Sequence, residues 1–225
     1  METVTGTEPT SEERADLYRW FSSLFAQELD AAAWSSHVGD EFLSALDEQA
    51  GELGLEDEAS ALREFLVAHR ADETDEAVLE LAVDYARLFV GPGPGQAPPY
   101  ESIYTGPKAR LFGEAYADVV EVLQREGIGV AKDFHAPADH AAVELSVMAY
   151  LLDGPEDDAV PASRNVPSEG GGERAFFERH IMNWFPAWCR DIDEHDPQGF
   201  YRGVARFMMG FLRGEAARME GGAAS

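Results

Sequence analysis

Apolar residues recur at intervals of three and four along most of this 225-residue chain, the spacing that places them on one face of an α-helix. The clearest stripes are Leu17, Trp20, Phe21, Leu24 and Phe25 near the start, and Phe200, Val204, Phe207, Met208 and Phe211 near the end. No comparable run alternates apolar and polar residues as a half-buried strand does. The pattern predicts an all-α fold, a single-domain helical bundle of about eight helices.

Residues that favour helix ends predict several boundaries. Thr10 and Glu13 have the spacing of a capping box before the first helix. Pro186 is expected to kink or interrupt the helix that carries Phe176 to Trp188. Asp196 is expected to cap the last helix, with Pro197 in its first position. Further helices are predicted from Asp40 to near Gly51, around Leu62 and Leu66, from Thr74 to Gly91, from Pro107 to Gly127, and from Pro137, where Asp139 is the expected cap, through Leu151.

Proline and glycine mark the predicted loops. Residues 91–99 read GPGPGQAPP, which excludes regular structure and predicts a stiff, irregular loop with a functional role. Residues 153–173 combine acids with three successive glycines and predict a mobile surface loop. Residues 1–9 and 216–225 are expected to be flexible ends of one domain spanning residues 1–225.

The chain is strongly acidic, with 17 Lys and Arg against 43 Asp and Glu and a formal net charge of −26. Such a surface repels nucleic-acid phosphates and anionic lipid, so neither is an expected partner. Only Lys108 and Lys132 are lysines, and this acid-rich, lysine-poor composition favours a salt-loving source. The N-terminus lacks an export signal and no apolar run is long enough to span a bilayer, so we expect a cytoplasmic protein without stable membrane insertion.

Three groups of residues are candidates for a catalytic or metal site. The glycine loop lacks the Gly-Lys-Ser/Thr ending of a nucleotide-binding P-loop. His135, Asp139, His140 and Glu144 include metal-ligand types, but their spacing matches no familiar metal motif, and Asp139 could instead cap a helix. Cys189, the single cysteine, could pair with His180 or His195, although an inert core cysteine is far more frequent. We therefore expect no catalytic residue and no bound metal.

A peptide-binding surface is the most specific function that the pattern favours. A helix ends in Tyr85, Leu88 and Phe89, and the Pro-rich loop follows it directly. Rigid prolines lower the cost of ordering a binding loop, and exposed apolar side chains could anchor a peptide. The alternative is that Leu88, Phe89 and Tyr104 are core residues that only hold the loop.

Three motifs are similar to those of the TorD/DmsD family, the maturation chaperones of molybdenum-cofactor oxidoreductases. The first is YARLFVGPGPGQAPPYESIY from Tyr85 to Tyr104, close to the family's Tyr-x-x-Leu-Phe-x-Gly-Pro, Pro-Pro and Glu-Ser-x-Tyr pattern. The second is Pro-Ala-Asp-His from Pro137 with Glu-Leu from Glu144, and the third is Phe-Glu-Arg-His-Ile-Met-Asn-Trp ending at Trp184. Ala136 and Asn183 stand where the family usually has Glu and Pro.

The resemblance implies a non-catalytic cytoplasmic chaperone that binds an apo molybdenum-cofactor oxidoreductase catalytic subunit, often through its N-terminal twin-arginine leader, and delays export until the cofactor is inserted. It implies no cofactor beyond weak guanine nucleotide binding. The apolar part of a leader would meet Leu88, Phe89 and Tyr100, and its arginines would meet Glu101 and Asp139. The alternatives are an assembly subunit of a nitrate-reductase-like complex and a metal-dependent enzyme. The full predicted peptide-binding set is Tyr85, Leu88, Phe89, Pro98, Pro99, Tyr100, Glu101, Ser102, Asp139 and His140.

Overall fold

The computed structural model describes residues 9–71, 74–90, 95–106, 111–130, 134–154, 171–196 and 199–222, and confirms the all-α prediction. These residues form eleven α-helices, two π-helical turns and one isolated bridge between Tyr100 and His140. The helices are α1 (Ser11–Ala26), α2 (Ala31–His37), α3 (Asp40–Leu53), α4 (Glu56–His69), α5 (Thr74–Tyr85), α6 (Glu101–Thr105), α7 (Glu114–Glu126), α8 (Ala141–Asp153), α9 (Gly171–Phe176), α10 (Phe185–His195) and α11 (Phe200–Gly222). The π turns are η1 (Ala86–Val90) and η2 (Phe177–Ile181).

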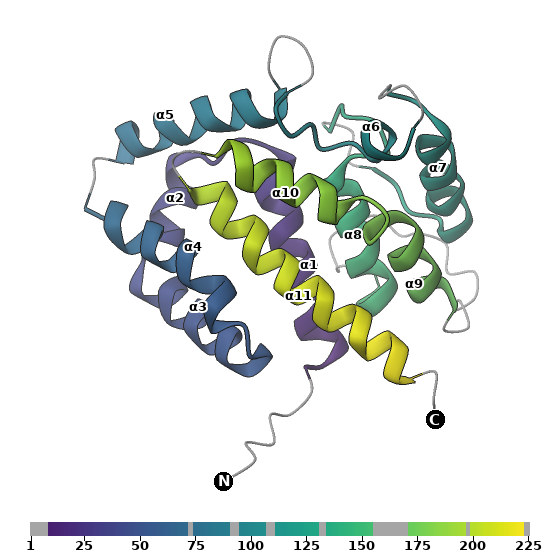
Figure 1. Cartoon of the computed structure of the whole chain (residues 1–225), viewed down its shortest axis with the longest axis horizontal. Coiled ribbons are helices and arrows are strands. Elements are labelled where there is room, and N and C mark those ends of the chain that lie inside the picture. The colour runs from purple at the N-terminus through teal and green to yellow at the C-terminus, as the bar shows by residue number, and fades with distance from the viewer. Residues whose placement is uncertain are drawn as a thin grey trace, which may run out of the picture. The chain divides into compact units, whose positions relative to one another are not determined.

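The chain divides into two compact units. Unit 1 contains residues 28–98 and 189–225 together with the first nine residues, and unit 2 contains residues 10–27 and 99–188. Each unit is therefore assembled from segments that are distant in the sequence (Figure 1). The expectation of one domain over residues 1–225 stays a prediction.

In unit 1, the long helix α11 packs closely against α4. A Cβ atom on Gly203 would lie 2.6 Å from the Leu62 Cα, so glycine is required for this approach. Trp34 and Phe65 each pack their rings against Phe200, with centroids 6.5 Å and 5.7 Å away. The core of this unit is thus aromatic where α2, α4 and α11 meet.

In unit 2, α1 packs along α8. The predicted capping box is confirmed at Thr10, whose side chain accepts from the Glu13 backbone while the Glu13 carboxylate accepts from the Thr10 backbone. Farther along α1, the Ser22 hydroxyl donates to the Ala142 carbonyl at 2.8 Å. Buried aromatic side chains from α1 and α10 complete the packing, with Phe25 edge-on to Trp188 at 4.7 Å.

Several predicted boundaries differ from the structure. Helix α2 was not predicted, because its seven residues contain one buried apolar side chain, Trp34, and give no periodic signal. The helix predicted from Pro107 to Gly127 corresponds to α7, which begins at Glu114. The short helix α6, which precedes it, was not predicted. Pro107 itself lies outside the described residues. Pro186 does not interrupt a helix: it lies in the first turn of α10, where its missing N–H costs nothing. The break falls at residues 182–184 instead.

The predicted flexible segments fall mainly outside the described residues. Residues 1–8 and most of the predicted loop 153–173 are not described, but the edges of that loop are helical: Asp153 ends α8, and Gly171 begins α9. Residues 216–222, which the sequence analysis expected to be part of a flexible end, continue α11, and their flexibility stays a prediction. Alanine and arginine in this stretch favour helix, which explains why α11 extends past Glu215.

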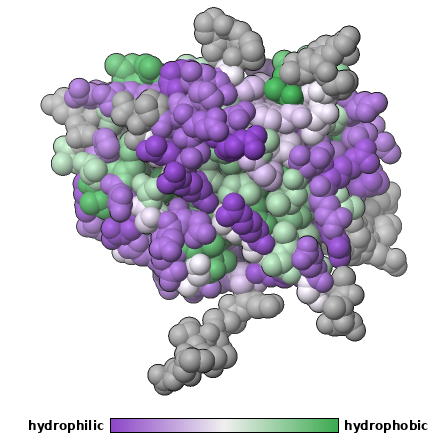
Figure 2. Space-filling view, in the orientation of Figure 1, coloured by the Kyte–Doolittle hydropathy of each residue, from purple (hydrophilic) through white to green (hydrophobic). Residues whose placement is uncertain are grey.

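The surface agrees with the acidic composition. Figure 2 shows a face dominated by hydrophilic residues, with smaller apolar patches between them. Among the helices that the structure describes, none is both long and apolar enough to cross a membrane.

Candidate functional site

Tyr85, Leu88 and Phe89, predicted to contact a peptide, point into the core of unit 1. Their exposed fractions are 6%, 0% and 5%. Phe89 packs edge-on against both Tyr85 and Tyr201, with ring centroids 5.1 Å apart in each case. In this conformation they offer little surface to a peptide, which agrees with the alternative interpretation that Leu88 and Phe89 hold the following loop.

The π turn η1 holds the end of the Pro-rich loop by its backbone. The Ala97 N–H donates to the Leu88 carbonyl at 2.8 Å. A Cβ atom on Gly95 would collide with the same carbonyl oxygen, so only glycine fits here. Arg87 donates to the Asp84 carboxylate at 2.9 Å and to the side-chain oxygen of Gln96 at 2.5 Å. The loop end at residues 95–98 is therefore fixed on η1 rather than free.

Helix α5 and the turn η1 also carry exposed apolar side chains. Leu79, Val83 and Val90 have exposed fractions of 65%, 59% and 64%. Glu76 and Glu80 are exposed beside them, three or four residues from Leu79 or Val83, and Glu80 also lines a pocket with the buried Asp84. We call the exposed residues Glu76, Leu79, Glu80 and Val83 of α5, together with Val90 of η1, the outer face of α5. It combines apolar anchors with carboxylates.

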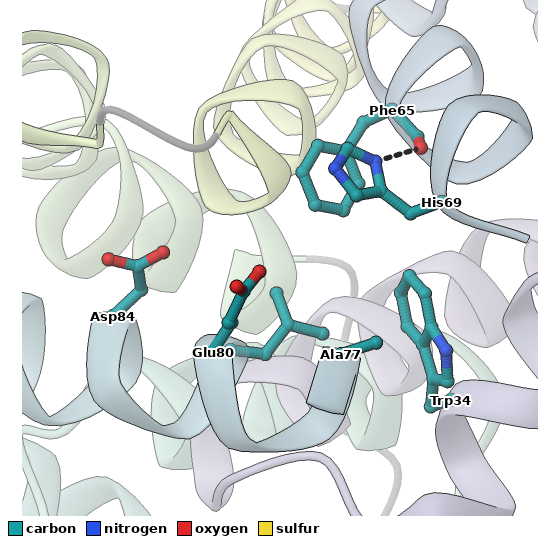
Figure 3. Close-up of a pocket in the computed structure, with 7 residues that line it drawn as sticks. Trp34, Phe65, His69, Ala77, Glu80 and Asp84 are labelled. Atoms are coloured by element: carbon teal, nitrogen blue, oxygen red, sulfur yellow. Dashed lines mark hydrogen bonds between the residues drawn. The ribbon is translucent and has the colours of Figure 1, made fainter. Parts of the chain in front are cut away.

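A small pocket in unit 1 lies beside Glu80. Figure 3 shows the Glu80 and Asp84 carboxylates rising from α5 in the same direction, while the Phe65 and His69 rings stack across the pocket. Its volume of about 10 Å³ leaves room for no more than about one water molecule. The pocket is too small for a ligand side chain, and the buried Asp84 carboxylate is already paired with Arg87.

In unit 2, two predicted motifs are joined by backbone hydrogen bonds. The Glu101 N–H donates to the Asp139 carbonyl at 3.0 Å, and the Ala141 N–H donates to the Pro99 carbonyl at 2.9 Å. The Tyr100 ring packs edge-on to the His140 ring with centroids 5.1 Å apart. The predicted proximity of these two motifs within unit 2 is thus present in the structure.

His140, not Asp139 as the sequence predicted, caps α8. The Nδ1 atom of His140 accepts from the Ala142 N–H at 3.1 Å. Burial lowers the pKa of His140 to about 4, so the imidazole is neutral at pH 7 and can accept this bond. Asp139 lies one residue before the cap position, and its Oδ2 atom accepts from the Ser102 backbone at 3.0 Å and from the Ser102 hydroxyl.

The two carboxylates expected to meet leader arginines are instead buried. Asp139 is 0% exposed and Glu101 is 3% exposed. Asp139 is bound by Ser102, and Glu101 is bound by the His180 Nδ1 atom at 2.8 Å. Arginines of a peptide could reach them only after rearrangement of unit 2.

Glu144, which the sequence offered only as a candidate metal ligand and as part of a motif, lies at the centre of this polar network. Glu144 accepts from the Trp184 indole N–H at 2.8 Å and is 0% exposed. Burial, and next the neighbouring Glu101 carboxylate, raise the pKa of Glu144 well above its ordinary value. Glu101, Glu144 and His180 are the one group of metal-ligand side chains that converges within the described residues. All three residues lie in the motifs that are similar to those of the TorD/DmsD family. That resemblance was the sequence signal that could have grouped them.

The other candidate residues have different roles. His135 is exposed, and no three of the candidate metal ligands His135, Asp139, His140 and Glu144 converge within the described residues. Cys189 is buried, and burial raises the pKa of its thiol, which disfavours the reactive thiolate. The His195 Nδ1 atom bonds to the Asp191 carbonyl at 2.8 Å.

The predicted peptide-binding set is divided between the units. Tyr85, Leu88, Phe89 and Pro98 belong to unit 1, and Pro99, Tyr100, Glu101, Ser102, Asp139 and His140 belong to unit 2. Pro98 and Tyr100 are half-buried, whereas Pro99 and Ser102 are buried. The role of this set in peptide binding stays a prediction.

Comparison with known proteins gives a consistent result. A family model described as nitrate reductase delta subunit matches residues 48–190. Chaperone protein TorD of Photobacterium profundum is 31% identical over 211 residues, which cover 94% of this chain and 96% of that protein. Chaperone protein TorD of Vibrio cholerae is 32% identical over 206 residues, covering 90% of each chain. The crystal structure of a candidate redox enzyme maturation protein from Archaeoglobus fulgidus shares the fold, with a TM-score of 0.51, 16% identity, and coverage of 93% of this chain and 98% of that one.

Proposed function

Because this chain belongs to the TorD family of redox-enzyme maturation chaperones, we propose that it binds the immature catalytic subunit of a molybdenum-cofactor oxidoreductase in the cytoplasm and holds it until the cofactor is inserted. The contact that we propose is with the client's N-terminal leader. Such a leader combines arginines with an apolar stretch, and the chaperone needs a surface that complements both.

The outer face of α5 is the observation that carries the leader proposal. Leu79 and Val83 are one helical turn apart and more than half exposed, so they can cover an apolar stretch without any change in the core. Glu76 and Glu80 lie beside them and can pair with guanidinium groups. The net charge of −26 adds long-range attraction for a basic peptide.

The buried residues of the same helix have a supporting role in this proposal. Tyr85, Leu88 and Phe89 anchor α5 and η1 to the core, and Gly95 lets the Pro-rich loop pack on η1. The outer face is then held on a rigid element, which lowers the entropy cost of binding.

Fluorescence anisotropy with a labelled twin-arginine leader peptide tests the proposal. The double variant Leu79→Ser, Val83→Ser should weaken binding at least tenfold, since about 1.4 kcal/mol corresponds to a factor of ten. Glu76→Gln with Glu80→Gln should weaken binding mainly at low salt, because added salt screens the charge term. Val67→Ser on α4, a position 39% exposed, is the matched control and should bind as the unmodified chain does.

Unchanged affinity in both double variants would reject the outer face of α5 as the leader site. Failure of the unmodified chain to bind any leader or apo-enzyme offered would reject the chaperone proposal itself.

A second candidate is a permanent assembly subunit, which the matching nitrate reductase delta subunit model favours. Purification of the mature oxidoreductase from its native membrane or soluble fraction distinguishes a permanent subunit from a maturation chaperone. A permanent subunit is recovered in stoichiometric amount with the cofactor-loaded enzyme, whereas a maturation chaperone is recovered with the apo-enzyme only.

A further inference from the structure

Three side chains of metal-ligand type meet inside unit 2. Glu101 comes from α6, Glu144 from α8 and His180 from η2, so three separate elements bring them together. One ligand atom from each lies within 4.8 Å of the other two. None of the three is more than 3% exposed. The group therefore combines two carboxylates and one imidazole at a single buried point.

One carboxylate oxygen of this group is buried without a hydrogen-bond partner. Trp184 donates to Glu144 Oε2 at 2.8 Å, and the His180 Nδ1 atom is 2.8 Å from Glu101 Oε2. Glu144 Oε1 is buried and makes no hydrogen bond within the described residues. A buried oxygen without a partner is costly, and a cation would satisfy it.

A groove in unit 2 leads to the imidazole. It has a volume of about 280 Å³ between α7 and the α9–η2 segment, and His180 is part of its lining. Asp118, Glu121 and Arg125 line the same groove from α7, and Arg179 lines it from η2. Arg179 is paired with Asp118, which reduces its repulsion of an incoming cation. Water and a small ion can thus approach His180 from solvent.

We propose that Glu101, Glu144 and His180 bind one divalent transition-metal ion, with Zn²⁺ the best match. Two carboxylates balance the charge of the ion, and an imidazole favours Zn²⁺ over Mg²⁺ or Ca²⁺. Trp184 orients Glu144 from outside the ligand group, as outer hydrogen bonds do in known metal sites. Three protein ligands leave a fourth position for water on the groove side. The proposal does not depend on leader binding.

Titration calorimetry of the full chain, first stripped with EDTA, tests the proposal with Zn²⁺ as the probe. We expect one ion per chain. Glu144→Gln keeps the size of the side chain and the Trp184 bond, and should weaken binding at least tenfold; His180→Asn should abolish it. His135→Asn changes an exposed histidine outside the group and should leave binding unchanged. Circular dichroism confirms that each variant is folded.

A second measurement needs no variant. X-ray absorption at the zinc edge of the loaded, unmodified chain should show nitrogen and oxygen ligands with a single imidazole. A sulfur ligand, two or more imidazoles, unchanged affinity in the folded Glu144→Gln chain, or no binding by the unmodified chain would each overturn the proposal.

Discussion

At the residue scale, His140 is an imidazole whose neutral form the fold requires. Its Nδ1 atom accepts the α8 capping bond, and its ring lies against Tyr100 and Phe134 with centroids 5.1 Å and 5.3 Å away. A protonated imidazole would lose the acceptor and bury a charge. Protonation of His140 therefore makes the stability of the folded chain depend on pH.

Stability should fall as pH decreases through the range between the unfolded and folded pKa values of His140. The pKa is about 4 in the folded chain and 6.5 in the unfolded chain, so between these values the unfolded state binds the extra proton and is favoured. The contribution is complete above pH 6.5 and is lost progressively toward pH 4, for a total of about 3 kcal/mol. Urea unfolding of the unmodified chain and of His140→Asn, measured at several pH values, checks this.

The difference between the two chains isolates His140 from the many other titrating groups. Asparagine can still accept the capping bond, so the variant keeps the cap and loses the titration. The unmodified chain should lose stability relative to His140→Asn as pH falls from 7 to 4. Parallel stability curves for the two chains would contradict the role assigned to His140.

Sequence reasoning identified most polar residues of this region but not their partners. Asp139, His140 and Glu101 are recognisable, because histidines and acids beside Pro-rich turns stand out in the sequence. Their partners Ser102 and His180 lie 37 and 79 residues away from Asp139 and Glu101, respectively. No local pattern encodes such pairings, since they depend on how the helices pack.

At the element scale, Gly203 sets the distance between α11 and α4. A Cβ atom here would lie 2.6 Å from the Leu62 Cα and 2.7 Å from its backbone nitrogen, and neither atom can move without moving α4. Gly214 lies on the same helix with nothing within 4 Å of its position for a Cβ atom. The two glycines therefore form a matched pair, one required by packing and one not.

Gly203→Ala should destabilise unit 1 by about 2 kcal/mol, the middle of the range for overpacked sites. Gly214→Ala should instead stabilise the chain by up to about 1 kcal/mol, because alanine is the better helix former. Thermal and urea unfolding of both variants measures the two effects. A stabilising Gly203→Ala would show that α4 and α11 are not held at the distance described here.

Helices with long apolar stripes were predictable, whereas short or irregular elements were not. Helices α1 and α11 span four or more turns, and their apolar stripes predict them directly. The five-residue α6 and the π turns η1 and η2 have no comparable stripe. Their geometry follows from tertiary contacts, such as the Ala97 bond to the Leu88 carbonyl, which periodicity does not contain.

At the scale of the whole molecule, the charge balance should control stability. Exposed ion pairs such as Arg63 with Asp47 and Arg206 with Asp193 are worth at most about 1 kcal/mol each, and salt weakens them. However, 43 acids face only 17 Lys and Arg, so most carboxylates repel one another without a basic partner. Because repulsion outweighs these few pairs, screening should favour the folded chain.

The midpoint of thermal unfolding should therefore rise as KCl increases from about 0.01 M to about 0.5 M, where the Debye length shrinks from roughly 30 Å to a few ångströms. We expect a rise of at least about 5 °C at pH 7.5, equivalent to roughly 2 kcal/mol for a chain of this size. At pH 5 the rise should be smaller, because part of the carboxylate charge is neutralised. A midpoint that stays constant or falls with KCl at pH 7.5 would show that the exposed ion pairs outweigh the repulsion, and would remove the physical basis for a salt-loving source.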